Sequence, residues 1–155
     1  MALSEIIDQS LKDYLSPSHY AHCSELLFKN VTKAWDPGFD EKLTRIATPF
    51  GEGLAGTQDV CGALVGGTMV IGYLLRRTTF TEDSGPSWQV AEEYYRKFMQ
   101  AFGKTTCRHI RGQIIDWNSH VRCSVTVQTA IKLLWEVLEK AKKEGTIRGL
   151  QEGKE

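Results

Sequence analysis

Apolar residues recur three and four positions apart along most of the chain, and no convincing stretch alternates between apolar and polar residues. This spacing predicts an all-α fold, a single-domain helical bundle. The expected helices cover residues 3–15, 19–35, 39–47, 61–77, 84–102, 105–111 and 118–143. Pro17, the pair Pro37 and Gly38, and Gly103 are expected to end helices, because proline and glycine interrupt helical hydrogen bonding.

The segment from Val60 to Leu75 is apolar on nearly every side, which predicts that its helix is the buried, Gly-rich centre of the bundle. Its sixteen residues are followed by Arg76 and Arg77. That length is short for a membrane span, so we do not expect an integral membrane protein.

A chain of 155 residues is long enough to form one domain with its own core. We expect a single helical domain over residues 1–145 and a polar tail over residues 146–155. Nineteen Lys and Arg balance nineteen Asp and Glu, so no net field attracts nucleic acid, and we exclude it as a partner. The N-terminus lacks the pattern of an export signal, which favours a cytoplasmic location. The apolar stripe of the last helix leaves a homodimer open.

The chemistry of the chain centres on four cysteines, Cys23, Cys61, Cys107 and Cys123, each in a different segment. In a reducing compartment, well-spaced cysteines are more often metal-binding or catalytic than bridged. If they converge they form a sulfur-rich redox or metal site, whereas scattered buried thiols would act as small hydrophobic residues. Cys61 follows Asp59, a good helix cap, so we expect it in a first helical turn with a lowered pKa.

Two glycines stand on one face of the central helix beside Cys61. Gly62 and Gly66, four residues apart, remove side-chain bulk where another helix or an inorganic cluster approaches. Upstream, residues 51–56 match the dinucleotide pattern G-x-G-x-x-G, but no strand precedes them, so nucleotide binding is not expected. These glycines are expected to form the tight loop that aims Cys61.

Histidines accompany three of the cysteines and leave a zinc site as an alternative. They are His19, His22, His109 and His120. Zinc accepts Cys and His in a tetrahedral shell, but no compact Cys-x-x-Cys pair is present, so the signal for zinc is weak.

The stretch Ile46-Ala-Thr-Pro-Phe-Gly-Glu-Gly-Leu-Ala-Gly56, followed by Cys61-Gly-Ala-x-x-Gly66, resembles the CGAxxG family, also labelled C_GCAxxG_C_C, of redox-active proteins. The segment Phe102-Gly-Lys-Thr-Thr-Cys107 and Cys123 at the start of the last helix match the later part of its pattern, and Cys23 matches the early cysteine. Val60 stands where one form of the label has glycine. The resemblance implies an all-helical, cytoplasmic protein, related to a cytochrome whose cysteine-rich part holds an iron–sulfur cluster.

The leading expectation is therefore that Cys23, Cys61, Cys107 and Cys123 ligate an iron–sulfur cluster used for electron transfer or sensing, with an unidentified redox partner. Thiol–disulfide chemistry, in which Cys61 attacks and another cysteine resolves, is the alternative. A structural zinc site, or a helical domain with no cofactor, also stays open. No hydrolase motif is present, so an enzymatic activity, if there is one, would be that of an oxidoreductase.

Overall fold

The computed structural model describes residues 1–75, 77–115, 118 and 122–147, and it is all-α as the sequence predicts. Three helices form the N-terminal part: α1 (Leu3–Tyr14), α2 (Cys23–Leu26) and, after the π-helical turn η1 (Leu27–Val31), α3 (Thr32–Trp35). Two 3₁₀ helices follow, η2 (Glu41–Ile46) and η3 (Thr48–Phe50). The remainder contains α4 (Gly62–Leu75), α5 (Gly85–Phe102), α6 (Cys107–Gly112) and α7 (Ser124–Lys143).

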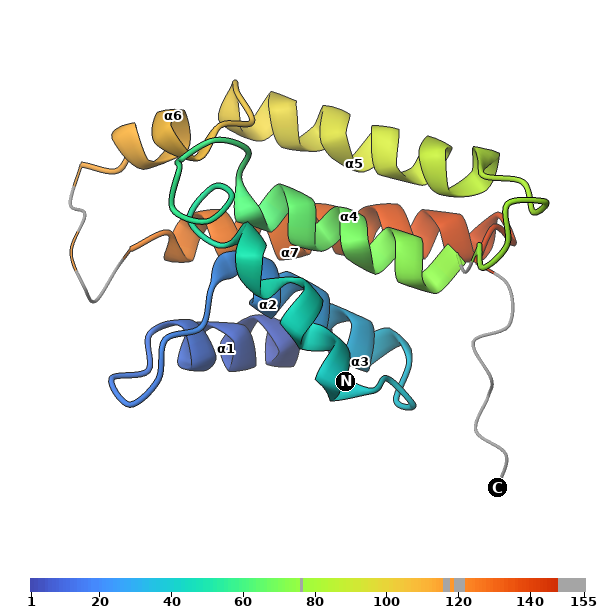
Figure 1. Ribbon diagram of the computed structural model, residues 1–155, viewed down its shortest axis with the longest axis horizontal. Helices are drawn as coiled ribbons and strands as arrows, with labels where there is room; N and C mark the ends of the chain where they lie inside the picture. The colour runs from blue at the N-terminus through green and yellow to red at the C-terminus, as the bar shows by residue number, and fades with distance from the viewer. Residues whose placement is uncertain (76, 116–117, 119–121, 148–155) are drawn as a thin grey trace.

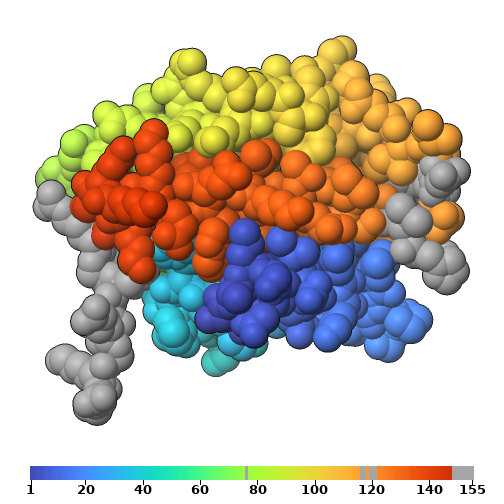
Figure 2. Space-filling view, turned by 180° about the vertical axis from the view of Figure 1, so that it is seen from behind, coloured from blue at the N-terminus to red at the C-terminus, as the bar shows by residue number. Residues whose placement is uncertain are grey.

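The central helix is α4, as its apolar sequence predicts. Helices α4, α5 and α7 run side by side along the long axis, and α1 to α3 pack beneath them (Figure 1). From behind, α7 crosses the whole face with α5 on one side and α1 on the other (Figure 2). Val70, Ile71 and Leu74 of α4 are fully buried, while Thr68 and Gly72 on the same helix are exposed.

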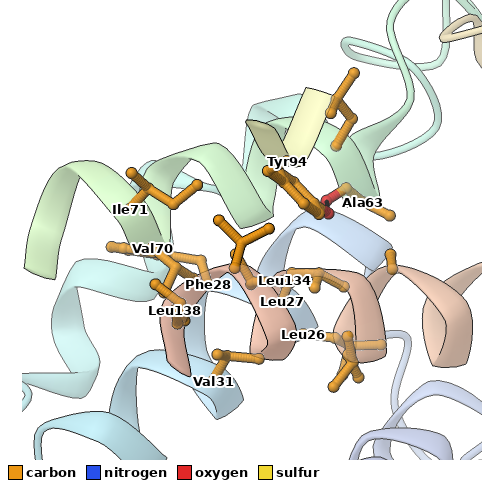
Figure 3. Packing of buried hydrophobic residues seen from close by; sticks show 14 of the residues in the cluster. Leu26, Leu27, Phe28, Val31, Ala63, Val70, Ile71, Tyr94, Leu134 and Leu138 are labelled. Atoms are coloured by element: carbon orange, nitrogen blue, oxygen red, sulfur yellow. Dashed lines mark hydrogen bonds between the residues drawn. The ribbon is translucent and has the colours of Figure 1, made fainter. Parts of the chain in front are cut away.

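A buried tyrosine joins α5 to α4. The ring of Tyr94 lies against Gly67, where an added Cβ would come within 2.5 Å of it. Its hydroxyl donates a hydrogen bond of 3.0 Å to the carbonyl oxygen of Ala63 (Figure 3). Because glycine leaves room for the ring and the carbonyl satisfies the hydroxyl, a bulky polar side chain is accommodated in the core.

The two largest differences from the expected helix boundaries are at helix starts. The second helix begins at Cys23 and not at residue 19, because the carboxylate of Glu25 accepts the backbone N–H of His22 (2.9 Å) and so fixes the start of the helix. The last helix begins at Ser124, with Cys123 before it, and not at 118; position 119 lies outside the described residues.

The signals of α5 are confirmed, with Pro86 in its first turn and Gly103 left-handed after its last residue (φ 77°). In the described part of the chain, no helix has the length and apolar character needed to cross a membrane.

Candidate functional site

The four cysteines gather at one end of the bundle, where α2, α4, α6 and α7 begin (left in Figure 1). Cys23 opens α2, Cys61 immediately precedes α4, Cys107 opens α6, and Cys123 immediately precedes α7. The thiols of Cys61, Cys107 and Cys123 all act electrostatically on that of Cys23. Four segments that are remote in sequence thus bring their sulfur atoms into one neighbourhood.

Cys61 and Cys107 are joined through the backbone. The N–H of Cys61 donates to the carbonyl of Thr105 (2.7 Å), and the N–H of Cys107 donates to the carbonyl of Asp59 (2.5 Å). These bonds flank an antiparallel bridge between Val60 and Thr106. Because side chains alternate across such a bridge, the two cysteines project from the same face, at diagonal positions. A single bridge has no alternating sequence pattern, so the periodicity gave no signal for it.

Cys23 reaches this pair through the glycine face of α4. A Cβ added to Gly62 would lie 2.5 Å from the Cys23 sulfur and 2.8 Å from the Phe50 carbonyl oxygen. One turn later, a Cβ on Gly66 would lie 2.5 Å from the Ser24 carbonyl oxygen. The close approach expected at these glycines is therefore made by α2 and by the Cys23 side chain. Their assignment to a cofactor stays a prediction.

Cys123 is held by the last residue of α1. Its backbone N–H donates to the hydroxyl oxygen of Tyr14 (3.0 Å), and that hydroxyl also forms a hydrogen bond with the Cys123 thiol. Tyr14 is buried, with 3% of its surface exposed. Helix α1 thereby holds the fourth cysteine. Tyr14 and Cys123 are 109 residues apart in the sequence, and no local motif predicts their contact.

The loop before Cys61 is largely left-handed. Gly53 and Gly56 have φ angles of 72° and 77°, as their sequence suggests, but the non-glycine residues Glu52, Leu54, Ala55 and Gln58 also have φ between 52° and 67°. Such angles cost about 1–2 kcal/mol for each L-residue. Gly53 has no room for a side chain, because an added Cβ would lie 2.5 Å from the Cβ of Cys107. The loop is therefore moulded closely onto the site.

The expected lowering of the Cys61 pKa is wrong. The backbone N–H groups of Ala63 and Leu64 do donate to its sulfur and lower the pKa, as a helix start predicts. Burial acts in the opposite direction and is stronger, since Cys61 is only 6% exposed, and the nearby Cys107 adds to it. The net result is to raise the pKa of Cys61 to about 11.

The other three thiols follow the same rule. Burial raises the pKa of Cys23 far above its usual range, the pKa of Cys123 to about 11, and the pKa of Cys107 by a smaller amount. A hydrogen-bond donor opposes burial at each sulfur: the Glu52 N–H at Cys23, the Arg111 side chain at Cys107 and the Tyr14 hydroxyl at Cys123. All four sulfurs thus receive a donor, yet all four thiols stay protonated at neutral pH.

Several residues that the sequence did not single out complete the site. A small cavity, about 30 Å³ in volume, lies between Cys23 and Cys123. The side chains that line it with the two cysteines are Tyr14, Tyr20, His22, Glu52, Arg111 and Arg122. Arg122 adjoins Cys123 in the sequence and His22 adjoins Cys23, whereas Tyr14, Glu52 and Arg111 come from segments distant from both cysteines.

The histidines among the described residues do not form a metal site with the cysteines. His22 lines the cavity, whereas His19 contacts Ser16 and Ser18, and His120 lies outside the described residues. Within the part of the chain that the structure describes, no three or more His, Cys, Asp or Glu side chains are grouped so as to hold a metal ion. A preformed site for a single zinc ion is therefore absent from these residues.

The sequence profile of one protein family, described as "Putative redox-active protein (C_GCAxxG_C_C)", matches residues 21–137. The match covers most of the chain and includes all four cysteines, so the protein belongs to this family. No curated protein and no solved structure matches the chain significantly.

Proposed function

We propose that the protein carries electrons through an iron–sulfur cluster ligated by Cys23, Cys61, Cys107 and Cys123. The observation that supports this most directly is that each of these four sulfurs faces a hydrogen-bond donor while lying in a buried environment. Donors favour a sulfur anion, and burial disfavours one unless a positive charge compensates it. Iron supplies that charge, so the donors and the burial are compatible when the thiolates are ligands.

The donor set fits a cluster better than a single ion. Four cysteine thiolates are the usual ligands of an iron–sulfur cluster, and hydrogen bonds to the sulfurs help to set its potential. A single zinc ion would hold all four sulfurs about 2.3 Å from one centre, whereas a cluster distributes them over several irons. Arg111 and Arg122 beside the sulfurs would offset the negative charge of the thiolates. When bound, the cluster would supply one-electron transfer.

A cluster needs more space than the thiols leave between them. The cavity beside Cys23 and Cys123, about 30 Å³, has room for one water molecule and not for a cluster. Ligation therefore requires the segments that carry the cysteines to move apart. The left-handed loop over residues 52–58, which precedes Cys61, is the segment that we propose moves.

Reconstitution under anaerobic conditions tests the proposal. The metal-free protein, incubated with ferrous iron and sulfide, is expected to gain visible absorption and to retain iron and acid-labile sulfide after desalting. Single Cys→Ser variants at the four positions should lose most of this iron. His19→Ala is the matched control, since His19 is exposed and contacts only Ser16 and Ser18 among the described contacts. A colourless wild-type protein without iron would contradict the proposal.

The backbone bridge favours one second candidate, a disulfide between Cys61 and Cys107. The two side chains project from one face of the bridge, but from diagonal positions, so a bond between their sulfurs requires the two segments to shift toward each other. In this reaction the two thiols lose two protons and two electrons and form an S–S bond, while a partner disulfide accepts both and leaves as two thiols.

Mild oxidation of the metal-free protein with diamide, followed by peptide mass spectrometry, distinguishes the two candidates. A reproducible Cys61–Cys107 bridge in a protein that does not retain iron would favour the disulfide. A retained cluster, with no such bridge in the loaded protein, would favour ligation.

A further inference from the structure

Arg122 occupies an unusual position beside the thiols. Its guanidinium lies 4.1 Å from the ring centre of Tyr14 and 4.0 Å from that of Tyr20, so two aromatic rings contact one cation. One of its N–H groups also donates to the carbonyl oxygen of Tyr14 (2.9 Å). Cation–π contacts strengthen as the cation loses water, and Arg122 is half-buried.

The backbone of Arg122 is left-handed, with φ 45°. An arginine at this angle carries strain that glycine would not, so the surrounding contacts must compensate it. Its N–H donates to the carbonyl oxygen of Asn118 (2.9 Å), and the next N–H, that of Cys123, donates to the Tyr14 hydroxyl. The backbone angle and the side-chain contacts therefore act together on the residue that carries the fourth thiol.

The contacts continue to the opposite thiol. The Tyr20 hydroxyl donates to the Glu52 carboxylate (2.7 Å), and the backbone N–H of Glu52 donates to the Cys23 sulfur. A continuous chain of contacts thus runs from Cys123 through Tyr14, Arg122, Tyr20 and Glu52 to Cys23. Both ends line the same small cavity.

We propose that Arg122 is a positioning residue: held between Tyr14 and Tyr20, its guanidinium fixes the Cys123 sulfur opposite the Cys23 sulfur. The inference deepens the proposed function, because it assumes that these two thiols work in one site. It does not depend on which redox group the site holds. Arg122 acts through the position of Cys123.

The effective concentration of Cys23 and Cys123 for each other measures this positioning in the metal-free protein. In a background with Cys61→Ser and Cys107→Ser, a glutathione redox buffer converts the two remaining thiols to a disulfide. Oxidised glutathione takes both electrons and both protons and leaves as two glutathione thiols. The equilibrium, read by mass spectrometry, reports how well the two sulfurs are held together and needs no cluster. Failure of cluster binding would leave it unchanged.

Arg122→Gly is the main variant, because it removes the guanidinium and relieves the left-handed backbone, so it should remain folded. Loss of two cation–π contacts should lower the effective concentration about tenfold. Arg122→Lys keeps a cation between the rings and should recover part of that loss. Tyr20→Leu should cause a smaller decrease and Tyr20→Phe a still smaller one, since phenylalanine keeps the ring. Arg96→Ala, an arginine on the exposed face of α5 paired with Glu92, is the matched control.

An effective concentration that stays within twofold of the parent in a folded Arg122→Gly protein would overturn the proposal. An equal decrease in Arg96→Ala would overturn it as well, because the effect would then be general. If Arg122→Gly does not fold, the ranking of Arg122→Lys, Tyr20→Phe and Tyr20→Leu decides. A decrease that is larger in Tyr20→Leu than in Tyr20→Phe supports positioning through the rings, and no decrease in any of the three refutes it.

Discussion

The pair Cys61 and Cys107 and the pair Cys23 and Cys123 occupy the same site but are held in different ways. Backbone hydrogen bonds on either side of the Val60–Thr106 bridge fix the first pair, and no side chain is required for them. Side chains contribute to holding the second pair: the Tyr14 hydroxyl holds Cys123, and the Tyr20 hydroxyl binds the carboxylate of Glu52, whose backbone N–H donates to the Cys23 sulfur. The first pair therefore has a set geometry, whereas the second is adjustable through substitution.

The donors to the sulfurs do not follow this division, because the Cys107 sulfur accepts from the Arg111 side chain and the Cys23 sulfur from the Glu52 backbone. The Cys61 sulfur accepts from the backbone N–H groups of Ala63 and Leu64, and the Cys123 sulfur accepts from the Tyr14 side chain. Both thiols nevertheless reach a pKa of about 11, because burial outweighs either kind of donor. The environment, more than the type of donor, sets the charge state of the free thiols.

Gly62→Ala should affect the two pairs differently, and it should have the largest effect on stability. Its Cβ would overlap the Cys23 sulfur and the Phe50 carbonyl oxygen, so α2 must move away from α4. We expect the free energy of unfolding to decrease by roughly 2–3 kcal/mol, the usual cost of overpacking. Urea unfolding measures the loss, and iron retention after reconstitution should decrease with it.

Gly72→Ala is the matched control on the same helix, because no neighbouring atom lies within 4 Å of its added Cβ. It should stabilise the protein by up to about 1 kcal/mol, since alanine is the better helix former. Equal effects of the two substitutions would show that α2 does not press on Gly62.

Alkaline pH should destabilise the metal-free protein through the backbone-held pair. The pKa of Cys61 is about 11 in the fold, against an ordinary value of 9.0, so the native state retains the proton that the unfolded state releases. The resulting stability is present below about pH 9 and is lost as the pH rises to 11. Its full size is roughly 2–3 kcal/mol.

Unfolding of the reduced protein in urea between pH 8 and 11 measures this contribution of Cys61 to the free energy of unfolding. Cys61→Ser has no thiol to titrate at position 61. The difference between its stability curve and that of the wild type therefore separates the contribution of Cys61 from that of Cys123, whose pKa is raised over the same range. Parallel curves for wild type and variant would contradict the burial of the thiol. When Cys123 is replaced instead, the decrease in the free energy of unfolding with pH that is due to Cys61 should remain.

The sequence was sufficient for the features that depend on neighbours in the chain. The helical periodicity, Pro86 in the first turn of α5 and the left-handed Gly103 after it are all local, and all are confirmed. The helix start at Cys61 is local too, and the two N–H donors to its sulfur are present. The predicted direction of the shift in its pKa was wrong, because burial depends on packing from distant segments.

The features that hold the side-chain pair had no local signal. Tyr14 and Cys123 are 109 residues apart, and neither belongs to a motif that pairs them. The left-handed angles of Glu52, Leu54 and Ala55 are likewise set by the fit of the loop against its surroundings, since these residue types do not favour such angles. Only the glycines between them indicated a tight loop.

Tyr14→Phe is the most selective test of the comparison, with the smallest expected effect. The variant keeps the ring against Arg122 but removes the hydroxyl that accepts the Cys123 N–H and donates to its sulfur. Stability should decrease by about 1 kcal/mol. Without this donor the pKa of Cys123 should rise further, so its alkylation by iodoacetamide at pH 8 should slow several-fold, while the rate at Cys61 stays constant. Tyr73→Phe is the control. It removes a hydroxyl that donates to the Asp36 carboxylate, and it should alter neither rate. Equal slowing at Cys61 and Cys123 would mean that the two pairs are not held independently.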